Sequence, residues 1–568
     1  MSIAERLKKA IADALKNLGA DGVSFTLEHP ADLAHGDYAT NAAMAAAKLL
    51  GKNPREVAEL VKAEIEKGSL AEIQSIEIAG PGFINFKLSK NFFTSTIPEI
   101  IASGKSFGTV TIHAGKKILV EHSSPNLFKP FHIGHMMNNA IGESLVRLMQ
   151  ASGADVQTMS FPSDISLGVA KAIYVLLEKQ VDGHLFHPTI EMLGNAYVEG
   201  TKKYDEDTSI HARVKEIADN LYASKDSPEW RLFEACKQFN ISYFEHVVSK
   251  LGSHFNSYIY ESEAGIVGKE IVMKNTPTIF TESEGAIVYI PDESKKHLNT
   301  AVFINSQGNP TYEAKDIGLL DLKFERVNPD LSIFITDNEQ IPHFDIVLDA
   351  AEKINQSWSE KSIHVPHGRM SFKGQKMSSR LGGVPLAADM IDEVALEAKT
   401  KLLHRDSDYG HVGAVAEKIA IAAIKFAILR AKPGQNINFD PETSLSFEGD
   451  SGPYLQYTHA RIQSLLEKGS EVGIHPGYSP AHDISGLEKI VYRLPEVVEL
   501  AIEEYAPQYV VTYLLEIARE FNSYYNANKI VDESDRETSA HRLAIARAVQ
   551  VVLKNGLYLL GIVAPDRM

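Results

Sequence analysis

The feature that most constrains the fold is the alternation of elements across residues 116–161. Residues 118–120 form a short apolar run, which is typical of a strand buried inside a parallel sheet. A polar loop follows, and then a segment with apolar residues three or four apart that ends at Gly153 predicts a helix. Residues 156–161 predict a second strand. Strand, loop, helix and strand make a βαβ unit, which requires a parallel sheet that binds its ligand at the carboxyl ends of the strands.

The sheet is expected to continue further along the chain. Strand-like runs return at 301–304, 332–336 and 362–365, and residues 343–354 have helical spacing. The intervening stretch, about 164–299, is helical and then mixed, and it has no clear chemical motif. We therefore expect an α/β nucleotide-binding domain over 111–400 that contains an insertion.

Both ends of the chain differ from this middle part. Residues 1–110 predict a small α+β domain: an amphipathic helix that stops at Gly19, a helix along HGDYATNAAMAAAKLLG with Ala39, Ala43, Ala46 and Leu49 on one face, and two strands around a Gly-Pro-Gly turn at 76–88. Residues 401–568 predict an all-α bundle. Its expected helices span 415–430, 453–468, 488–504, 508–527 and 540–559.

Composition sets limits on the class of protein. A chain of 568 residues is too long for one core, and roughly three or four units are expected. No apolar run approaches the length of about 20 residues that crosses a bilayer, and the N-terminus lacks a secretory pattern. The single cysteine, Cys236, excludes internal disulfides and multi-cysteine zinc sites, so a cytoplasmic location is expected. The net charge of -17 argues against a nucleic-acid partner unless basic residues gather locally.

The strongest chemical motif is His132-Ile133-Gly134-His135, placed between the first strand and the helix of the βαβ unit. Two imidazoles on the first turn of a helix, at the positive end of its dipole, form a good site for phosphate oxygens. Gly134 allows a nucleotide to approach the backbone closely. Taken alone, two such histidines are more often surface or core residues, or part of a metal site.

A second motif makes a phosphate-binding role of the two histidines more favoured than the ordinary alternatives. The segment GQKMSSRLGG places Lys376 and Arg380 between glycines, as in a loop that closes over anionic phosphates. A solvated charged loop is the ordinary alternative. The two motifs together, in this order and about a domain apart, favour phosphate chemistry.

This pair resembles the HIGH and KMSKS motifs of the class I aminoacyl-tRNA synthetases, in which the catalytic domain is of the Rossmann type. The resemblance implies that His132 and His135 hold the phosphates of ATP and that Lys376 closes over them, with Gly134, Met377 and Ser378 in the same site. Ser379 stands where the family has its second lysine. Lys129, just before the histidines, is expected to supply the missing charge, and the arginine enzymes of this class have a lysine there.

The string EHSSPNLFKPFHIGH is closely similar to the version of this motif in arginyl-tRNA synthetases. The resemblance implies an arginine site, and carboxylates suit a planar guanidinium. The residues of this arginine site would be Glu121, Asn126, Tyr312, Asp316 and Gln340. Each has an ordinary alternative, since Tyr312 and Asp316 could only share a helix face and Glu121 could be a loop carboxylate.

The ends of the chain resemble the other modules of that family. HGDYATNAAM with IAGPGFINF is similar to the module that binds the tRNA elbow, and the C-terminal helices are similar to the anticodon-binding domain. Core packing is the alternative for most apolar residues there. Stacking surfaces and basic groups that face tRNA are expected at Tyr457, Arg461, Arg542, Arg567 and Met568.

The resemblance implies ATP-dependent ligation of L-arginine to tRNA(Arg) through an arginyl-adenylate, with release of AMP and pyrophosphate. ATP would enter with Mg2+ as a substrate complex, with no tightly bound cofactor, no metal site and no membrane partner, and the enzyme would be monomeric. Two features depart from the family: FPSDISLG replaces a tryptophan-containing stretch, and Lys315 replaces a common arginine.

Two alternatives stay open at this point. One is another class I tRNA ligase or a related nucleotidyltransferase, although small nucleotidyltransferases do not need a helical bundle and the acidic Glu121 and Asp316 favour a cationic amino acid. The other is a tRNA-binding relative that has lost activity. The presence of both histidines, Lys129 and Lys376 argues against that loss.

Overall fold

A five-stranded parallel sheet lies at the centre of the computed structural model, which describes residues 2–68, 70–179, 187–223, 226–372, 386–405 and 412–568. The strand order is β12-β11-β5-β6-β7, and every neighbouring pair is parallel. This confirms the predicted α/β class. The strands are β5 Lys117–Glu121, β6 Asp155–Ser160, β7 Ser257–Tyr258, β11 Leu331–Asp337 and β12 Ser362–His367.

The side of the sheet on which the chain adds strands changes between β5 and β11. From β5 it proceeds to β6 and β7 on one side, and it returns on the other side with β11 and β12. Ligands of open α/β sheets bind at such a point, beyond the carboxyl ends of the strands. Glu121 ends β5 there and lies opposite Phe334 of β11.

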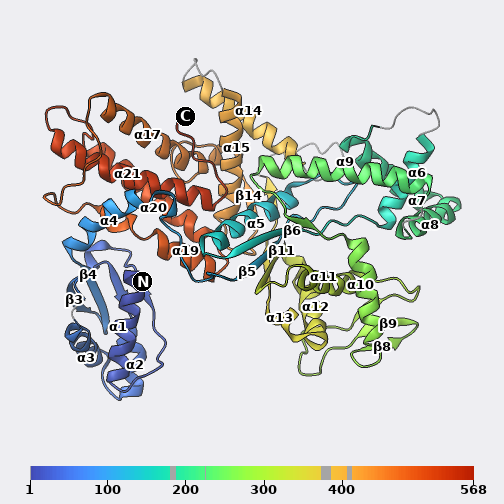
Figure 1. Ribbon diagram of the computed structural model, residues 1–568, viewed down its shortest axis with the longest axis horizontal. Coiled ribbons are helices and arrows are strands. Elements are labelled where there is room, and N and C mark those ends of the chain that lie inside the picture. The colour runs from blue at the N-terminus through green and yellow to red at the C-terminus, as the bar shows by residue number, and fades with distance from the viewer. Residues whose placement is uncertain (1, 69, 180–186, 224–225, 373–385, 406–411) are drawn as a thin grey trace.

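The helix α5 (Ile133–Ala151) follows β5 and is buried on most of its surface. It packs against the sheet on one side and against helices of the C-terminal bundle on another (Figure 1). Its buried residues include Met136, Leu145, Leu148 and Met149, which belong to the main hydrophobic core. The predicted βαβ unit therefore forms as expected, with α5 between β5 and β6.

The stretch expected as one insertion at about 164–299 consists of two separate parts. The first, α6 Leu167–Lys179, α7 Ile190–Glu206, α8 His211–Tyr222 and α9 Pro228–Lys250, has its own core, which contains Cys236. Strand β7 then returns to the parallel sheet. The second part begins with α10 (Glu261–Lys274) and continues with an antiparallel sheet of order β10-β9-β8.

This antiparallel sheet changes the assignment of one expected strand. The run at 301–304 is β10, and it pairs with β9 instead of joining the parallel sheet. The strands are β8 Phe280–Ser283, β9 Ala286–Tyr289 and β10 Ala301–Ile304. The chain then forms α11 Tyr312–Arg326, α12 Ile341–Ile354 and α13 Gln356–Glu360.

The N-terminal domain is a four-stranded antiparallel sheet covered by helices. The strand order is β1-β2-β4-β3, and the hairpin of β3 and β4 is the one expected around the Gly-Pro-Gly turn. The expected helix after His35 starts later than its alanine spacing indicated, because Ala39 lies in β2, and Leu49 is 62% exposed. The elements are α1 Ile3–Asn17, β1 Leu27–Glu28, β2 Tyr38–Thr40, α2 Ala42–Leu50, α3 Pro54–Lys67, β3 Ile73–Ala79, β4 Phe83–Leu88 and α4 Lys90–Ser103.

The C-terminal part is helical, as predicted. One expected helix, 488–504, is two helices, since the chain turns between Val491 and Leu494 and Pro495 lies in the first turn of the second helix. A short parallel pair, β13 Met370–Phe372 and β14 Ile437–Phe439, joins this part to the domain of the parallel sheet. The helices are α14 Ala387–Arg405, α15 Val412–Leu429, α16 Pro441–Ser444, α17 Gly452–Glu471, α18 Gly486–Val491, α19 Leu494–Glu503, α20 Gln508–Ala527 and α21 Arg536–Leu559.

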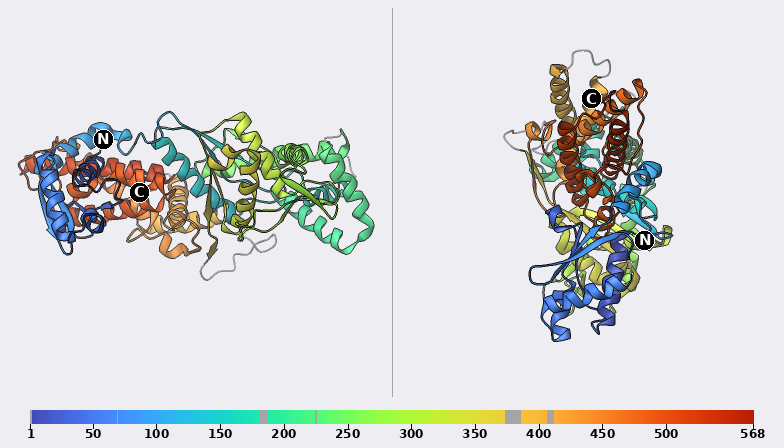
Figure 2. Two further views of the ribbon diagram at one scale, coloured as in Figure 1. Left: turned by 90° about the horizontal axis from the view of Figure 1, so that it is seen from below. Right: turned by 90° about the vertical axis from the view of Figure 1, so that its left-hand side faces the viewer.

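The molecule is elongated, with the N-terminal domain and the bundle at one end and α6–α8 at the other (Figure 2). The N-terminal domain docks on the bundle around Glu496 of α19. The Tyr38 hydroxyl donates to one carboxylate oxygen of Glu496 (2.6 Å), and His29 Nε2 lies 3.1 Å from the other. Tyr492 completes the apolar core of the N-terminal domain from the bundle side. Within the described ranges, no helix is long and apolar enough to cross a bilayer.

Two basic side chains join α5 and the end of α9 to the bundle. The fully buried ammonium of Lys425, on α15, donates to the Leu251 carbonyl at the end of α9 and to the Gly561 carbonyl after α21 (2.9 Å). Arg147 of α5 donates to the Tyr558 carbonyl (2.8 Å) and to the Gly252 carbonyl (3.1 Å). Carbonyls at helix C-termini lack partners within the helix and carry partial negative charge, so these N–H donors stabilise the junction.

Helices α10 and α11 cross so closely that two glycines are required. A Cβ on Gly268 would lie 1.7 Å from the Ala314 carbonyl oxygen, and a Cβ on Gly318 would lie 2.0 Å from the Ala264 carbonyl oxygen. At Gly265, on the same helix α10, a Cβ would meet nothing closer than 3.5 Å. The position of α11, which contains Asp316, therefore depends on this contact.

The variant Gly268→Ala should unfold more easily than the wild type, because the new methyl group forces the two helices apart. We expect a loss of about 1–3 kcal/mol, which is typical of overpacking, together with weaker binding of whatever ligand Asp316 contacts. Thermal unfolding followed by calorimetry measures the first effect. The matched control Gly265→Ala should unfold at or above the wild-type temperature. Equal destabilisation of both variants would contradict the argument.

Candidate active site

The two histidines of the HIGH motif cap the start of α5. His132 is the N-cap residue, and its Nδ1 accepts a hydrogen bond from the Gly134 backbone N–H (3.1 Å). The Nδ1 of His135 accepts from the His132 backbone N–H (3.3 Å). The rings stack with their centroids 3.8 Å apart. Because Nδ1 is the acceptor in both rings, each neutral imidazole carries its proton on Nε2 as a donor.

Both histidines stay neutral near pH 7. Burial lowers the pKa of His132, and the charge of Lys129 lowers it further. Burial also lowers the pKa of His135, with smaller contributions from His132 and Lys129. Lys129 lies over the ring of Tyr197 from α7, with its Nζ 4.8 Å from the ring centre. The start of α5 thus combines two Nε2–H donors, a nearby cation and the positive end of a helix dipole, which suits an anion.

The loop that contains the second motif ends beside these histidines. Lys376, Met377, Ser378, Ser379 and Arg380 lie outside the described residues. The residue where the description resumes, Leu386, pairs with His132 in an antiparallel bridge, and the Ala387 backbone N–H donates to the Phe131 carbonyl (2.9 Å). The first described residues after the second motif therefore lie beside the first motif.

The two expected arginine-binding carboxylates also meet at this edge. Glu121 and Asp316 line one small cavity of about 20 Å³, together with Lys323 and apolar residues of β11 and α12. Glu121 forms a buried ion pair with Lys323. The Nε2 of His343 donates to Asp316 (2.6 Å), and burial raises the pKa of Asp316 against the lowering effect of His343. Both carboxylates already have a cationic partner.

The other three expected arginine-binding residues are more accessible. Tyr312 is the first residue of α11 and is 65% exposed, one turn before Asp316. Asn126 is exposed in the loop after β5, where it bridges to Ser163, and Gln340 is exposed just before α12. All three lie on segments that begin or end at the carboxyl edge of the sheet.

The described structure adds residues that the motifs did not point to. Glu313 and His343 flank Asp316, and Glu261 pairs with Lys315 (2.8 Å) on the neighbouring helix. The position of Glu313, directly after the expected residue Tyr312, was the one available signal in the sequence. Among the described residues, no group of three or more His, Cys, Asp or Glu side chains is arranged to hold a metal ion.

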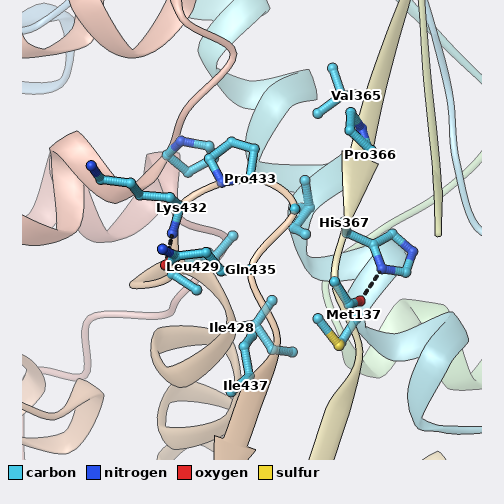
Figure 3. Close-up of a pocket in the computed structure, with 15 residues that line it drawn as sticks. Met137, Val365, Pro366, His367, Ile428, Leu429, Lys432, Pro433, Gln435 and Ile437 are labelled. Carbon is cyan, nitrogen blue, oxygen red and sulfur yellow. Dashed lines mark hydrogen bonds between the residues drawn. The ribbon is translucent and has the colours of Figure 1, made fainter. Parts of the chain in front are cut away.

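A second small cavity lies behind the site, where the catalytic domain meets the bundle (Figure 3). It measures about 20 Å³, and Met137, Val365, Ile428 and Ile437 contribute apolar side chains to its wall. His367 donates from Nδ1 to the Gly368 carbonyl (2.7 Å). Of the described residues, none that is expected to bind ATP or arginine lines this cavity.

The expected tRNA-contact residues are mostly half-buried. The Arg461 guanidinium lies over the rings of Tyr457 (4.8 Å) and Tyr525 (5.1 Å), and Arg542 donates to the Lys529 carbonyl (2.9 Å). Met568 packs partly against the main core. Arg567 is mostly exposed and lies 3.4 Å from Glu467. Of these five residues, only Arg567 is exposed, and the others are half-buried against neighbouring parts of the bundle.

Comparisons with known proteins agree along the chain. The family model "tRNA synthetases class I (R), catalytic domain" matches residues 96–440. "Arginyl tRNA synthetase N terminal domain" matches 5–88, and "DALR anticodon binding domain" matches 455–568.

Curated relatives and solved structures match over full length. The chain is 29% identical to an arginine–tRNA ligase from Clostridium perfringens, over 99% of this chain and 100% of the relative. It is also 29% identical to one from Oenococcus oeni, over 100% of this chain and 99% of that relative. The fold is similar to arginyl-tRNA synthetase of Thermus thermophilus (TM-score 0.84, 24% identity, 100% of both chains) and of Plasmodium falciparum (TM-score 0.82, 20% identity, 100% of this chain and 99% of that one). Because the catalytic-domain model alone matches more than half of its length, this chain belongs to the class I tRNA synthetases, in the family specific for arginine.

Proposed function

We propose that one active site at the carboxyl edge of the parallel sheet activates L-arginine with ATP and then transfers it to tRNA(Arg). His132, His135, Lys129 and Lys376 form the ATP side, with Gly134, Met377 and Ser378. Glu121, Asn126, Tyr312, Asp316 and Gln340 form the arginine side. One observation carries this proposal. The carboxylates of Glu121 and Asp316 lie at the same edge of the sheet at which α5 and its two histidines start.

In the first step the arginine carboxylate attacks the α-phosphorus of ATP, and pyrophosphate leaves. Negative charge shifts toward the departing pyrophosphate, so donors aimed at those oxygens stabilise the transition state more than the ground state. The Nε2–H groups of His132 and His135 and the ammonium of Lys129 are such donors. Magnesium enters as part of the ATP complex, bridging phosphate oxygens.

In the second step a hydroxyl of the terminal tRNA ribose, the 2′ hydroxyl by analogy with the class, attacks the activated carbonyl and AMP leaves. The N-terminal domain and the bundle bind the tRNA, with the stacked Tyr457 and Arg461, Arg542 and Met568 as contact residues of the bundle. The docking of these two parts through Tyr38 and Glu496 supports their action as one surface. We expect a cytoplasmic monomer.

Pyrophosphate exchange into labelled ATP tests the proposal as a whole. The assay covers all twenty amino acids, each with and without total tRNA. We expect exchange with arginine only, and only in the presence of tRNA. Exchange with another amino acid would leave the class intact and refute the arginine site. No exchange by folded protein would favour a non-catalytic tRNA-binding relative.

The variant His132→Asn separates the capping role of the imidazole from its catalytic role. Asparagine is a good N-cap residue and accepts from the Gly134 N–H, but it lacks a donor at the position of Nε2. We expect an unchanged unfolding temperature and a fall in the rate of exchange of about 10²–10³. The longer amide of His132→Gln reaches toward the Nε2 position and should lose less. Full turnover by His132→Asn would remove this residue from catalysis.

The variant Asp316→Asn tests the arginine side. Removing the charge should raise the KM for arginine by at least about tenfold, because a charge-assisted hydrogen bond to the guanidinium is lost, while the KM for ATP changes little. The control Asp321→Asn replaces a carboxylate on the same helix that does not line the cavity, and it should leave both constants unchanged. Unchanged arginine affinity in Asp316→Asn would refute the assignment.

A further inference from the structure

His343 sits between two carboxylates in the arginine pocket. Its Nε2 lies 2.6 Å from Oδ2 of Asp316, and its Nδ1 lies 3.6 Å from Oε1 of Glu313. Both carboxylates come from α11, one turn apart, whereas His343 comes from the first turn of α12. A ring with an acceptor at each nitrogen is satisfied best when both nitrogens carry a proton. The geometry therefore favours the imidazolium form.

The charges around this ring leave the pocket with one unpaired negative charge. Glu121 is paired with Lys323, and Glu261 is paired with Lys315. His343, when protonated, balances one of its two partners, Asp316 and Glu313. His364 of β12 faces His343 from the sheet, and burial lowers its pKa to about 4, so it stays neutral. A guanidinium that replaces the charge of the imidazolium leaves this net charge unchanged.

The protonation state of His343 is set by its neighbours. Burial alone would lower the pKa of His343, but the hydrogen bonds and charges of Asp316 and Glu313 outweigh burial and raise it to about 9. The free pocket thus holds a cation against Asp316 at pH 7. A guanidinium placed on the same carboxylate would then lie a few ångströms from a like charge in a poorly solvated pocket, which disfavours the imidazolium.

We propose that His343 is a positioning residue that holds the Asp316 carboxylate in the empty pocket and releases a proton to solvent when the guanidinium of arginine binds there. The N–H bond on the Nδ1 side breaks, the ring becomes neutral, and Nε2–H remains to orient Asp316. Arginine binding is then an exchange of one cation for another. This inference rests on the proposed arginine site.

The exchange predicts a pH dependence with a definite sign. A ligand that displaces a proton binds more tightly as pH rises, until the free pocket has lost that proton by itself. The affinity for arginine should therefore increase with pH between the pKa that His343 has in the complex and its pKa in the free pocket, which is about 9. At higher pH the affinity should level off. Within that window, one proton released per arginine corresponds to about a tenfold fall in Kd per pH unit.

Titration calorimetry of the full-length wild-type protein with arginine tests the proposal. Measured at pH 7 in phosphate and in Tris, two buffers with very different heats of ionisation, the observed enthalpies should differ by an amount that corresponds to the release of up to about one proton per arginine. The variant His343→Gln keeps a donor toward Asp316 but cannot titrate, so it should bind arginine with the same enthalpy in both buffers. The matched control His364→Gln, on the neighbouring strand, should behave as the wild type.

Each result has a distinct meaning. Arginine binding by the wild type without proton release overturns this inference and leaves the proposed arginine site standing. Proton release that persists in His343→Gln also overturns it, because another group must then titrate. If that variant does not fold, the Kd of the wild type between pH 6 and 9 decides, and a flat profile overturns the inference. No arginine binding by folded wild-type protein refutes the proposed function instead.

Discussion

The helix α5 is the element on which the rest of the structure depends. Its N-terminus is capped by the two histidines that bind phosphate in the proposed reaction, and its C-terminal half is joined to the end of α21. The Ser144 hydroxyl donates to the Leu559 carbonyl (2.9 Å), beside the contacts of Arg147 and Lys425. A helix is stiff along its axis, so the position of the histidines is fixed relative to the bundle. The site and the tRNA-binding part are thereby connected through one rigid element.

Charge compensation is the second organising constraint. The proposed arginine pocket gathers several carboxylates in a poorly solvated region, and each unpaired charge there would be costly. The fold places Lys323, Lys315 and His343 among them, so the pocket keeps a small net charge.

Much of the fold could be predicted because its signals are local. The βαβ unit, the hairpin of β3 and β4 and the helix α20 follow from hydrophobic spacing and turn residues within about 20 positions. Where prediction failed, a non-local contact decided. Strand β10 pairs with β9 in the antiparallel sheet and not with the parallel sheet, and the two-residue strand β7 is too short to have a recognisable pattern. Half-burial of Arg461 and Tyr457 likewise depends on helices distant in sequence.

The sequence by itself determined the class of protein and predicted the reacting groups, because HIGH, KMSSR and EHSSPN are contiguous strings whose chemistry can be read without coordinates. Only the tertiary structure decided which partners those groups have. Glu121 with Lys323, and Asp316 with His343, come from strands and helices that meet only after the sheet is assembled. Protonation states and pocket charge depend on distances of a few ångströms, and those distances are set by packing and not by the order of residues along the chain.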